Sequence, residues 1–168
     1  MGASVNEDVL CGLFAERVRS SPEFATWMLG HTKFADRASV VRLLAEEQSR
    51  RPGKAWWRHW WCGVPKTGRQ SETDIFLVFE MATGERFALH IENKIDAPFM
   101  PFQPEDYGPR AAHMANNRWV PYADFATMLI APRAYLANQA EKCGLFDTTI
   151  SHEEIAAFIP EYKARVAA

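Results

Sequence analysis

Residues 71–95 read SETDIFLVFEMATGERFALHIENKI, and this stretch decides the fold class. Apolar residues alternate with other residues from Thr73 to Met81 and again from Arg86 to Ile95. A period of two is typical of strands, and Ala82-Thr83-Gly84 has the composition of a turn. The stretch therefore predicts two adjacent strands joined as a hairpin.

Upstream of this hairpin, the sequence predicts one more strand and several helices. The aromatic-rich segment from Ala55 to Val64 favours a strand, separated from the hairpin by polar residues 65–71. The three strands together would form an antiparallel meander. Apolar residues at helical spacing predict three earlier helices, namely Val5 to Ser20 with Asn6 or Ser4 as cap, a helix with Pro22 at its first position that stops at Gly30, and Asp36 to Arg51.

Downstream, helices and strands alternate. We expect a helix from Pro104, a buried strand over Phe125 to Ala131 (FATMLIA), a helix from Tyr135 to Cys143, a short strand over Asp147 to Ile150 and a last helix capped by Ser151. No repeat or linker interrupts residues 1–168, so the pattern predicts one α/β layered domain with a central mixed sheet flanked by helices.

Composition narrows the function classes. The chain has 168 residues and a formal net charge of −2, which counts against a protein that coats DNA but less against an enzyme. Cys11, Cys62 and Cys143 lack metal-site spacing and predict reduced thiols in a cytoplasmic protein. Met1 to Asp8 does not resemble a signal peptide, and no apolar stretch is long enough to span a membrane.

The candidate chemistry lies where the predicted hairpin opens. Asp74 begins one strand, while Glu92 and Lys94 lie two apart near the end of the next and therefore share a face. Two carboxylates brought together repel, and a divalent cation such as Mg²⁺ relieves this repulsion. Lys94 would then orient a metal-bound water or stabilise the phosphate, and the carbonyl of Asn93 could be a further metal ligand.

Simpler interpretations of these charges exist. An Asp followed by Glu-x-Lys arises by chance in charged sequences, and strand ends often carry solvated Glu and Lys. However, Phe87, Leu89 and Ile91 alternate with the face that carries Glu92, which favours a specific placement. His90 shares the face of Glu92, and we interpret it as a packed or exposed residue rather than a metal ligand.

A second signal follows in the next predicted helix. Gln103 and Tyr107 are at positions i and i+4 and therefore lie on one helical face. Both side chains can hydrogen-bond a phosphate or a catalytic carboxylate. Arg110 lies near that face and could hold a phosphate.

Asp74, the segment Glu92-Asn93-Lys94-Ile95, and the pair Gln103 and Tyr107 together resemble the PD-(D/E)XK nuclease superfamily, in the groups with a QxxxY helix. The segments TDIFLVF and FALHIENKIDA resemble the two strands that carry its motif. The N-terminal stretch NEDVLCGLFAERVRSSPEF is similar to the opening helix of several prokaryotic members. The resemblance implies that a helix glutamate assists the metal site, and the matching residue is Glu7.

Two departures from the family pattern bear on this resemblance. Thr73-Asp74 replaces the Pro-Asp of the motif, and Gly108-Pro109 interrupts the QxxxY helix, which leaves its length open. The helix glutamate also has alternatives, because Glu46 and Glu47 lie on the third predicted helix.

The resemblance implies a restriction-endonuclease-like three-layer fold and a magnesium- or manganese-dependent nuclease. Its catalytic residues would be Asp74, Glu92, Lys94, Gln103, Tyr107 and Glu7, and its metal ligands would be Asp74, Glu92 and Asn93. The expected substrate is DNA, and a homodimer is expected from the resemblance alone. The alternatives are a catalytically silent nucleic-acid-binding or complex-forming module with the same fold, and a domain whose motif is coincidental.

Four tryptophans surround Arg58 and His59. On a strand, Trp56 and Trp60 would share one face, while Trp57 and Trp61 would share the other. Core packing or a subunit interface is the favoured interpretation. Stacking on single-stranded bases is the alternative.

Overall fold

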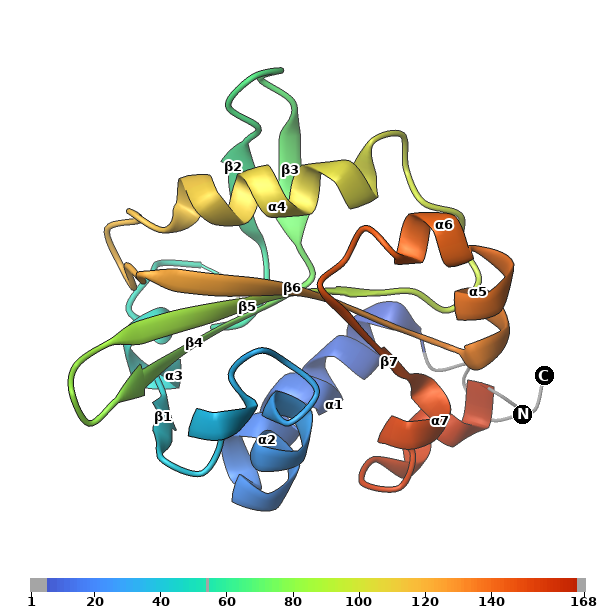
Figure 1. Cartoon of the computed structure of the whole chain (residues 1–168), viewed down its shortest axis with the longest axis horizontal. Coiled ribbons are helices and arrows are strands. Elements are labelled where there is room, and N and C mark those ends of the chain that lie inside the picture. Colours follow the sequence, from blue (N-terminus) through green and yellow to red (C-terminus); the bar gives the residue numbers. More distant parts are fainter. Residues whose placement is uncertain (1–5, 54, 166–168) are drawn as a thin grey trace.

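The two strands that flank the turn at residues 82–84 lie at the centre of a five-stranded mixed sheet (Figure 1). The protein is represented by a computed structural model, which describes residues 6–53 and 55–165. In spatial order, the strands are β1 (Val41–Leu43), β4 (Ile75–Met81), β5 (Arg86–Asn93), β6 (Asp124–Ala131) and β7 (Thr148–Ser151).

Strand directions follow from the connections. β4 and β5 form the predicted antiparallel hairpin, in which Gly84 has a positive φ of 88° that suits a tight turn. β1 is antiparallel to β4, whereas β6 and β7 continue the sheet in parallel. A parallel neighbour requires a crossover, and helix α4 (Gln103–Met114) makes the crossover from β5 to β6.

Helices cover both faces of the sheet (Figure 1). α4 covers one face, and α1, α2 and α7 lie on the other. The helical elements other than α4 are α1 (Glu7–Ser20), α2 (Pro22–Leu29), η1 (Ala35–Arg37), α3 (Ala45–Ser49), α5 (Arg133–Asn138), α6 (Ala140–Cys143), α7 (His152–Ile155) and η2 (Pro160–Arg165).

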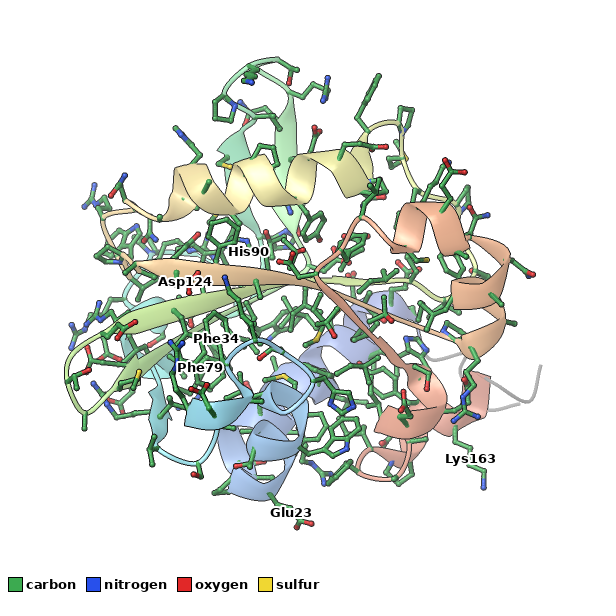
Figure 2. The ribbon with its side chains drawn as sticks, viewed as in Figure 1. Glu23, Phe34, Phe79, His90, Asp124 and Lys163 are labelled. Carbon is green, nitrogen blue, oxygen red and sulfur yellow. The ribbon has the colours of Figure 1, made fainter. Side chains whose placement is uncertain are left out.

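Alternating residues of β4 and β5 supply the two cores. Leu77 and Leu89 pack with α1 and α2 in the larger cluster, whereas Phe76 and Ala88 pack with Met114 of α4. Figure 2 shows Phe34 and Phe79 on the side of α1 and α2, and His90 on the side of α4. The face of β5 that carries Glu92 therefore lies beneath α4, not in solvent.

A separate two-stranded sheet lies beside this core. β2 (Trp60–Gly63) and β3 (Gln70–Thr73) form an antiparallel hairpin that projects past α4 (Figure 1). β3 ends at Thr73 and β4 begins at Ile75, so Asp74 is the single residue between the two sheets. The predicted meander of three strands is therefore wrong, because the first strand pairs with β3 and not with β4.

The helix predicted from residues 36 to 51 is also wrong. This segment contains η1, the edge strand β1 and the short helix α3. Val41 and Leu43 pair with the edge of β4, and the Leu44 N–H continues this edge with a bond to the Val78 carbonyl. Pairing with a distant strand outweighed the local helical spacing. The preference of this segment for a helix is weak, because it contains β-branched residues.

The predicted strand from residue 55 to 64 is shorter than expected. Only Trp60–Gly63 is extended, because the chain turns between Ala55 and Arg58 and His59 has a positive φ of 58°. Several other predictions are confirmed, including the Asn6 cap, Pro22 at the start of α2 and the capping box at Ser151. Among the described residues, no helix is long and apolar enough to cross a membrane.

Candidate metal-binding site

Glu92 lies near the end of β5 and is only 2% exposed. Gln103 Nε2 donates a hydrogen bond of 2.8 Å to its Oε1. The Tyr107 hydroxyl, one turn further along α4, donates to its Oε2. The i, i+4 spacing in the sequence therefore brings both side chains to one carboxylate, as the QxxxY pattern predicts.

Helix α4 keeps this arrangement although it contains Pro109. The helix continues to Met114, so the expected interruption does not occur. Pro109 removes one N–H donor from the helical ladder, and the carbonyl left without that donor belongs to the exposed Glu105. Water can bind this carbonyl, which makes the proline tolerable at this position.

Asp74 is held by the strand that carries Glu92. Its Oδ2 accepts a hydrogen bond of 3.0 Å from the Asn93 N–H. The N–H and C=O of one strand residue point toward the same neighbour. The Asn93 carbonyl is therefore directed toward Asp74 as well, which suits the predicted set of three oxygen ligands.

Lys94 follows Glu92 into the same buried region. Its Nζ lies 3.3 Å from Glu92 Oε1 and 3.5 Å from the Pro98 carbonyl, and the residue is only 5% exposed. The Lys94 N–H donates to the Ile130 carbonyl, which extends the pairing of β5 with β6. The ammonium group is thus fixed beside the carboxylates and cannot swing freely in solvent.

Glu7, at the start of α1, contacts the same end of β5. Its Oε1 accepts a hydrogen bond of 3.1 Å from the Ile95 N–H. Glu47, one of the alternatives, instead forms an ion pair with Arg42 beside the β1 edge. These contacts favour Glu7 over Glu46 and Glu47 as the helix glutamate near the site.

Burial and mutual repulsion act on the two carboxyl groups. Burial raises the pKa of Asp74 well above its usual range, and the charge of Glu92 raises it further. Burial also raises the pKa of Glu92, although Lys94 and the Tyr107 hydrogen bond oppose this shift. A cation between the two groups would remove the repulsion and favour their ionised forms.

The sequence did not indicate the residue that orients Asn93 from the opposite side. His152 Nε2 lies 2.8 Å from the Asn93 Oδ1, and Asn93 Nδ2 donates to the Glu7 carbonyl at 3.4 Å. Because the amide oxygen only accepts, His152 Nε2 carries the proton. No local pattern could reveal this pair, since the two residues are 59 positions apart.

Arg110 occupies a different place from the one expected. It is fully buried, so in this arrangement it cannot reach a phosphate in solvent. Its guanidinium donates to the hydroxyls of Ser71 and Thr73, the latter at 3.0 Å. Arg110 therefore fixes the end of β3 immediately before Asp74.

His90 is packed, as expected, and belongs to the same polar layer. Its Nδ1 lies 2.9 Å from Thr73 Oγ1 and its Nε2 lies 2.8 Å from the Tyr122 hydroxyl. Tyr122 in turn donates to the Ala111 carbonyl at 2.5 Å. The tyrosine must therefore accept from His90, which fixes the Nε2–H tautomer. Burial lowers the pKa of His90 well below its usual range and keeps the ring neutral.

These oxygen ligands suit a hard divalent cation that binds only a few protein groups. Among the residues that the structure describes, no group of three or more His, Cys, Asp or Glu side chains is arranged to hold a metal ion. Asp74 and Glu92 supply two carboxylates, and the Asn93 carbonyl supplies a third oxygen. Mg²⁺ is commonly held by one or two carboxylates together with water and substrate phosphates, so these residues fit it.

No protein-family model, curated protein or solved structure matches this chain. The resemblance to PD-(D/E)XK nucleases therefore rests on the motif residues themselves. Geometry adds that Gln103 and Tyr107 of α4 and Lys94 after β5 surround the buried carboxylate of Glu92.

Proposed function

We propose that this protein is a metal-dependent nuclease with a restriction-endonuclease-like fold, and that it hydrolyses phosphodiester bonds, with DNA as the expected substrate. One observation carries the proposal. Gln103, Tyr107 and Lys94 converge on Glu92, and the next residue, Asn93, holds Asp74. Chance placement of solvated charges would not produce a buried cluster of this kind.

The arrangement of the sheet supports the same proposal. Asp74 precedes β4, Glu92 and Lys94 lie at the end of β5, and the two strands are antiparallel neighbours. The open end of the hairpin therefore carries all three motif residues. Gln103 and Tyr107 contact Glu92 at this end, and both belong to the crossover helix α4, which lies on one face of the sheet (Figure 1).

The chemical roles follow from charge and position. Asp74, Glu92 and the Asn93 carbonyl would hold Mg²⁺ or Mn²⁺, which when bound lowers the pKa of water and neutralises charge on phosphate. The ammonium group of Lys94 lies 3.3 Å from Glu92 Oε1, and it would orient the attacking water and stabilise charge on the phosphate. Gln103 and Tyr107 act as positioning residues, because they contact Glu92 and orient its carboxylate.

One observation favours the alternative of a catalytically silent module. Glu92 accepts contacts from Gln103, Tyr107 and Lys94, which occupy most of the roughly four acceptor sites of a carboxylate. A protein that only binds nucleic acid would keep this arrangement without cleavage. The two functions differ in whether metal produces turnover.

A cleavage assay tests the proposal. Plasmid, linear duplex, single-stranded DNA and RNA would be incubated with the protein in Mg²⁺, in Mn²⁺ and in EDTA. We expect metal-dependent cleavage of at least one substrate by the wild type and by Asp36→Asn, a control that removes an exposed carboxylate. Loss of cleavage in Asp74→Asn alone would support the site. Absent cleavage would favour the silent module, and metal-independent cleavage would contradict the proposed metal site.

A further inference from the structure

A cavity of about 490 Å³ lies between β2 and the C-terminal end of α4, apart from the carboxylates. Three tryptophans contribute to its lining, namely Trp60, Trp61 and Trp119. Arg51, His113 and Arg118 add basic groups, and none of the described lining residues is Asp or Glu. Its size is in the range of cavities that hold small ligands.

The aromatic walls of this cavity differ in their exposure. Trp60 is buried in the core, whereas Trp61, the next residue on β2, is 57% exposed. An exposed indole next to a cavity provides a flat surface that costs little conformational entropy to use. Core packing therefore does not account for Trp61, whose exposed ring is free to contact a partner.

Trp119 is held in place before any ligand binds. The Asn117 side chain accepts hydrogen bonds from the N–H groups of Trp119 and Val120, at 3.0 and 2.8 Å. The same side chain donates to the carbonyls of Met114 and Val120. Asn117 therefore fixes the loop after α4, and a preorganised wall lowers the entropic cost of binding.

The basic groups are also placed before binding. Arg51 lies over the Trp60 ring, with 3.8 Å between its Cζ and the ring centroid, and donates to the His59 carbonyl at 2.7 Å. Arg118 lies over Trp119 with 4.5 Å between Cζ and centroid. Glu72 lies opposite Trp61 on β3, but it pairs with His59 at 2.9 Å. The cavity therefore combines aromatic rings with an excess of positive charge.

We propose that this cavity, the Trp61–Trp119 pocket, binds an unpaired base and an adjacent phosphate of a single-stranded nucleic acid. Unpaired bases stack on aromatic side chains, and arginine neutralises the phosphates beside them. Bases in a duplex are already stacked on one another and cannot enter in this way. The inference rests on the proposed function and deepens it, because it names the strand that the nuclease would hold.

The spacing suits one continuous strand. Gln103 at the first turn of α4 contacts Glu92, and Met114 at its last turn lines the pocket. Eleven residue steps in an α-helix cover about 17 Å, which corresponds to at most about five nucleotides, since about 3.4 Å is the rise per base of a fully stacked strand. A strand of about twelve nucleotides is therefore long enough to reach both sites.

Binding can be measured without cleavage by fluorescence anisotropy in EDTA, with labelled twelve-nucleotide strands of DNA and of RNA and with the matching duplex. We expect the wild type to bind single strands more tightly than the duplex. Trp61→Ala should weaken single-strand binding about tenfold, whereas Trp61→Phe should retain most of it. Leu145→Ala, which shortens a side chain of similar exposure elsewhere, should bind as the wild type does.

The salt dependence of binding distinguishes the contribution of the Arg118 charge from that of the Trp61 ring. Arg118→Gln should reduce the slope of log affinity against log salt by about 0.7, the value for one phosphate on a single strand. Trp61→Ala should leave that slope unchanged. Circular dichroism would confirm that each variant is folded.

Three outcomes would contradict the proposal that this pocket binds single-stranded nucleic acid. They are no binding of single strands by the wild type in EDTA, an unchanged affinity in Trp61→Ala, and an unchanged salt slope in Arg118→Gln. None of these outcomes bears on metal-dependent cleavage, which the Asp74→Asn comparison tests separately. A failure of the pocket is therefore distinguishable from a failure of the proposed nuclease activity.

Discussion

The main-chain N–H of Asn93 donates a hydrogen bond of 3.0 Å to Asp74 Oδ2, across the open end of the β4–β5 hairpin. The strand that carries Glu92 and Lys94 thus also orients the carboxylate on the neighbouring chain segment. Neither carboxylate depends on a flexible loop for its position. Because both carboxylates are held in place, single substitutions can distinguish effects on metal binding from effects on cleavage.

Asp74→Asn should lose metal binding and cleavage together. The substitution removes one negative charge from the ligand set while preserving size, so the affinity for Mn²⁺ should fall by at least tenfold. Excess Mn²⁺ should restore part of the cleavage. Calorimetric titration with Mn²⁺ and a cleavage assay over a metal series would measure both effects. Normal metal affinity in this variant would remove Asp74 from the ligand set.

Lys94→Met, unlike Asp74→Asn, should reduce cleavage without reducing metal binding. Methionine keeps much of the side-chain length beside Phe99 but removes the ammonium group, which is 3.3 Å from Glu92 Oε1. We expect metal binding to remain and cleavage to fall by about 100-fold or more, because a preorganised charge at the phosphate is lost. Added metal should not restore activity. Metal-rescue curves identical to those of Asp74→Asn would show that the two roles are misassigned.

Tyr107→Phe should shift the pH dependence of cleavage. The Tyr107 hydroxyl lowers the pKa of Glu92, so its removal raises that pKa further and leaves one carboxylate oxygen without its donor. The acid limb of the rate profile should therefore move to higher pH. Folding stability should fall by about 1–3 kcal/mol.

Tyr135→Phe is the matched control for this change, because Tyr135 donates to the Ala97 carbonyl at 2.9 Å and does not contact Glu92. It should lose some stability without a shift of the acid limb. An identical shift in both variants would mean that the effect is not transmitted through Glu92. Rate profiles from pH 5 to 9 and thermal unfolding would provide the measurements.

His152→Gln should reduce sensitivity to acid. Burial lowers the pKa of His152 from 6.5 to about 4, so below pH 6.5 the unfolded chain binds a proton that the folded chain does not. The stability from the neutral ring is complete above about pH 6.5 and declines as the pH falls toward 4, by on the order of 3 kcal/mol. Glutamine does not titrate and can still donate to Asn93.

The measurement is the difference in Tm between pH 7.5 and pH 4.5. We expect this difference to be smaller in His152→Gln than in the wild type, since His90 acts in the same direction in both proteins. His113→Gln, which replaces an exposed histidine, should leave the difference unchanged. Equal Tm differences in all three proteins would contradict the assignment of this acid sensitivity to His152.

Local spacing predicted a large part of the candidate site. The period of two placed Glu92 and Lys94 on one face, and the i, i+4 spacing brought Gln103 and Tyr107 to one side of α4. These relationships depend only on the regular geometry of a strand and of a helix. The β4–β5 hairpin and the Ser151 capping box were predictable for the same reason.

The missed features depend on residues far apart in the chain. β1 exists because Val41 finds the edge of β4, about forty residues further on. β2 and β3 form a separate sheet and contact α4, which lies far along the chain from β2. The contact between His152 and Asn93 and the interior position of Arg110 have no local signal. Short-range patterns constrain elements, but they do not determine which elements meet.

The position of Asp74 between the two sheets has a thermodynamic consequence. Its carboxylate belongs to the proposed cation site, while its preceding neighbours continue into the hairpin that carries Trp61. Any cooperativity between a strand on that hairpin and a cation at Asp74 must be reciprocal. The factor by which the strand changes cation affinity equals the factor by which the cation changes strand affinity. Titrating Mn²⁺ with and without an uncleavable oligonucleotide would therefore determine both effects at once.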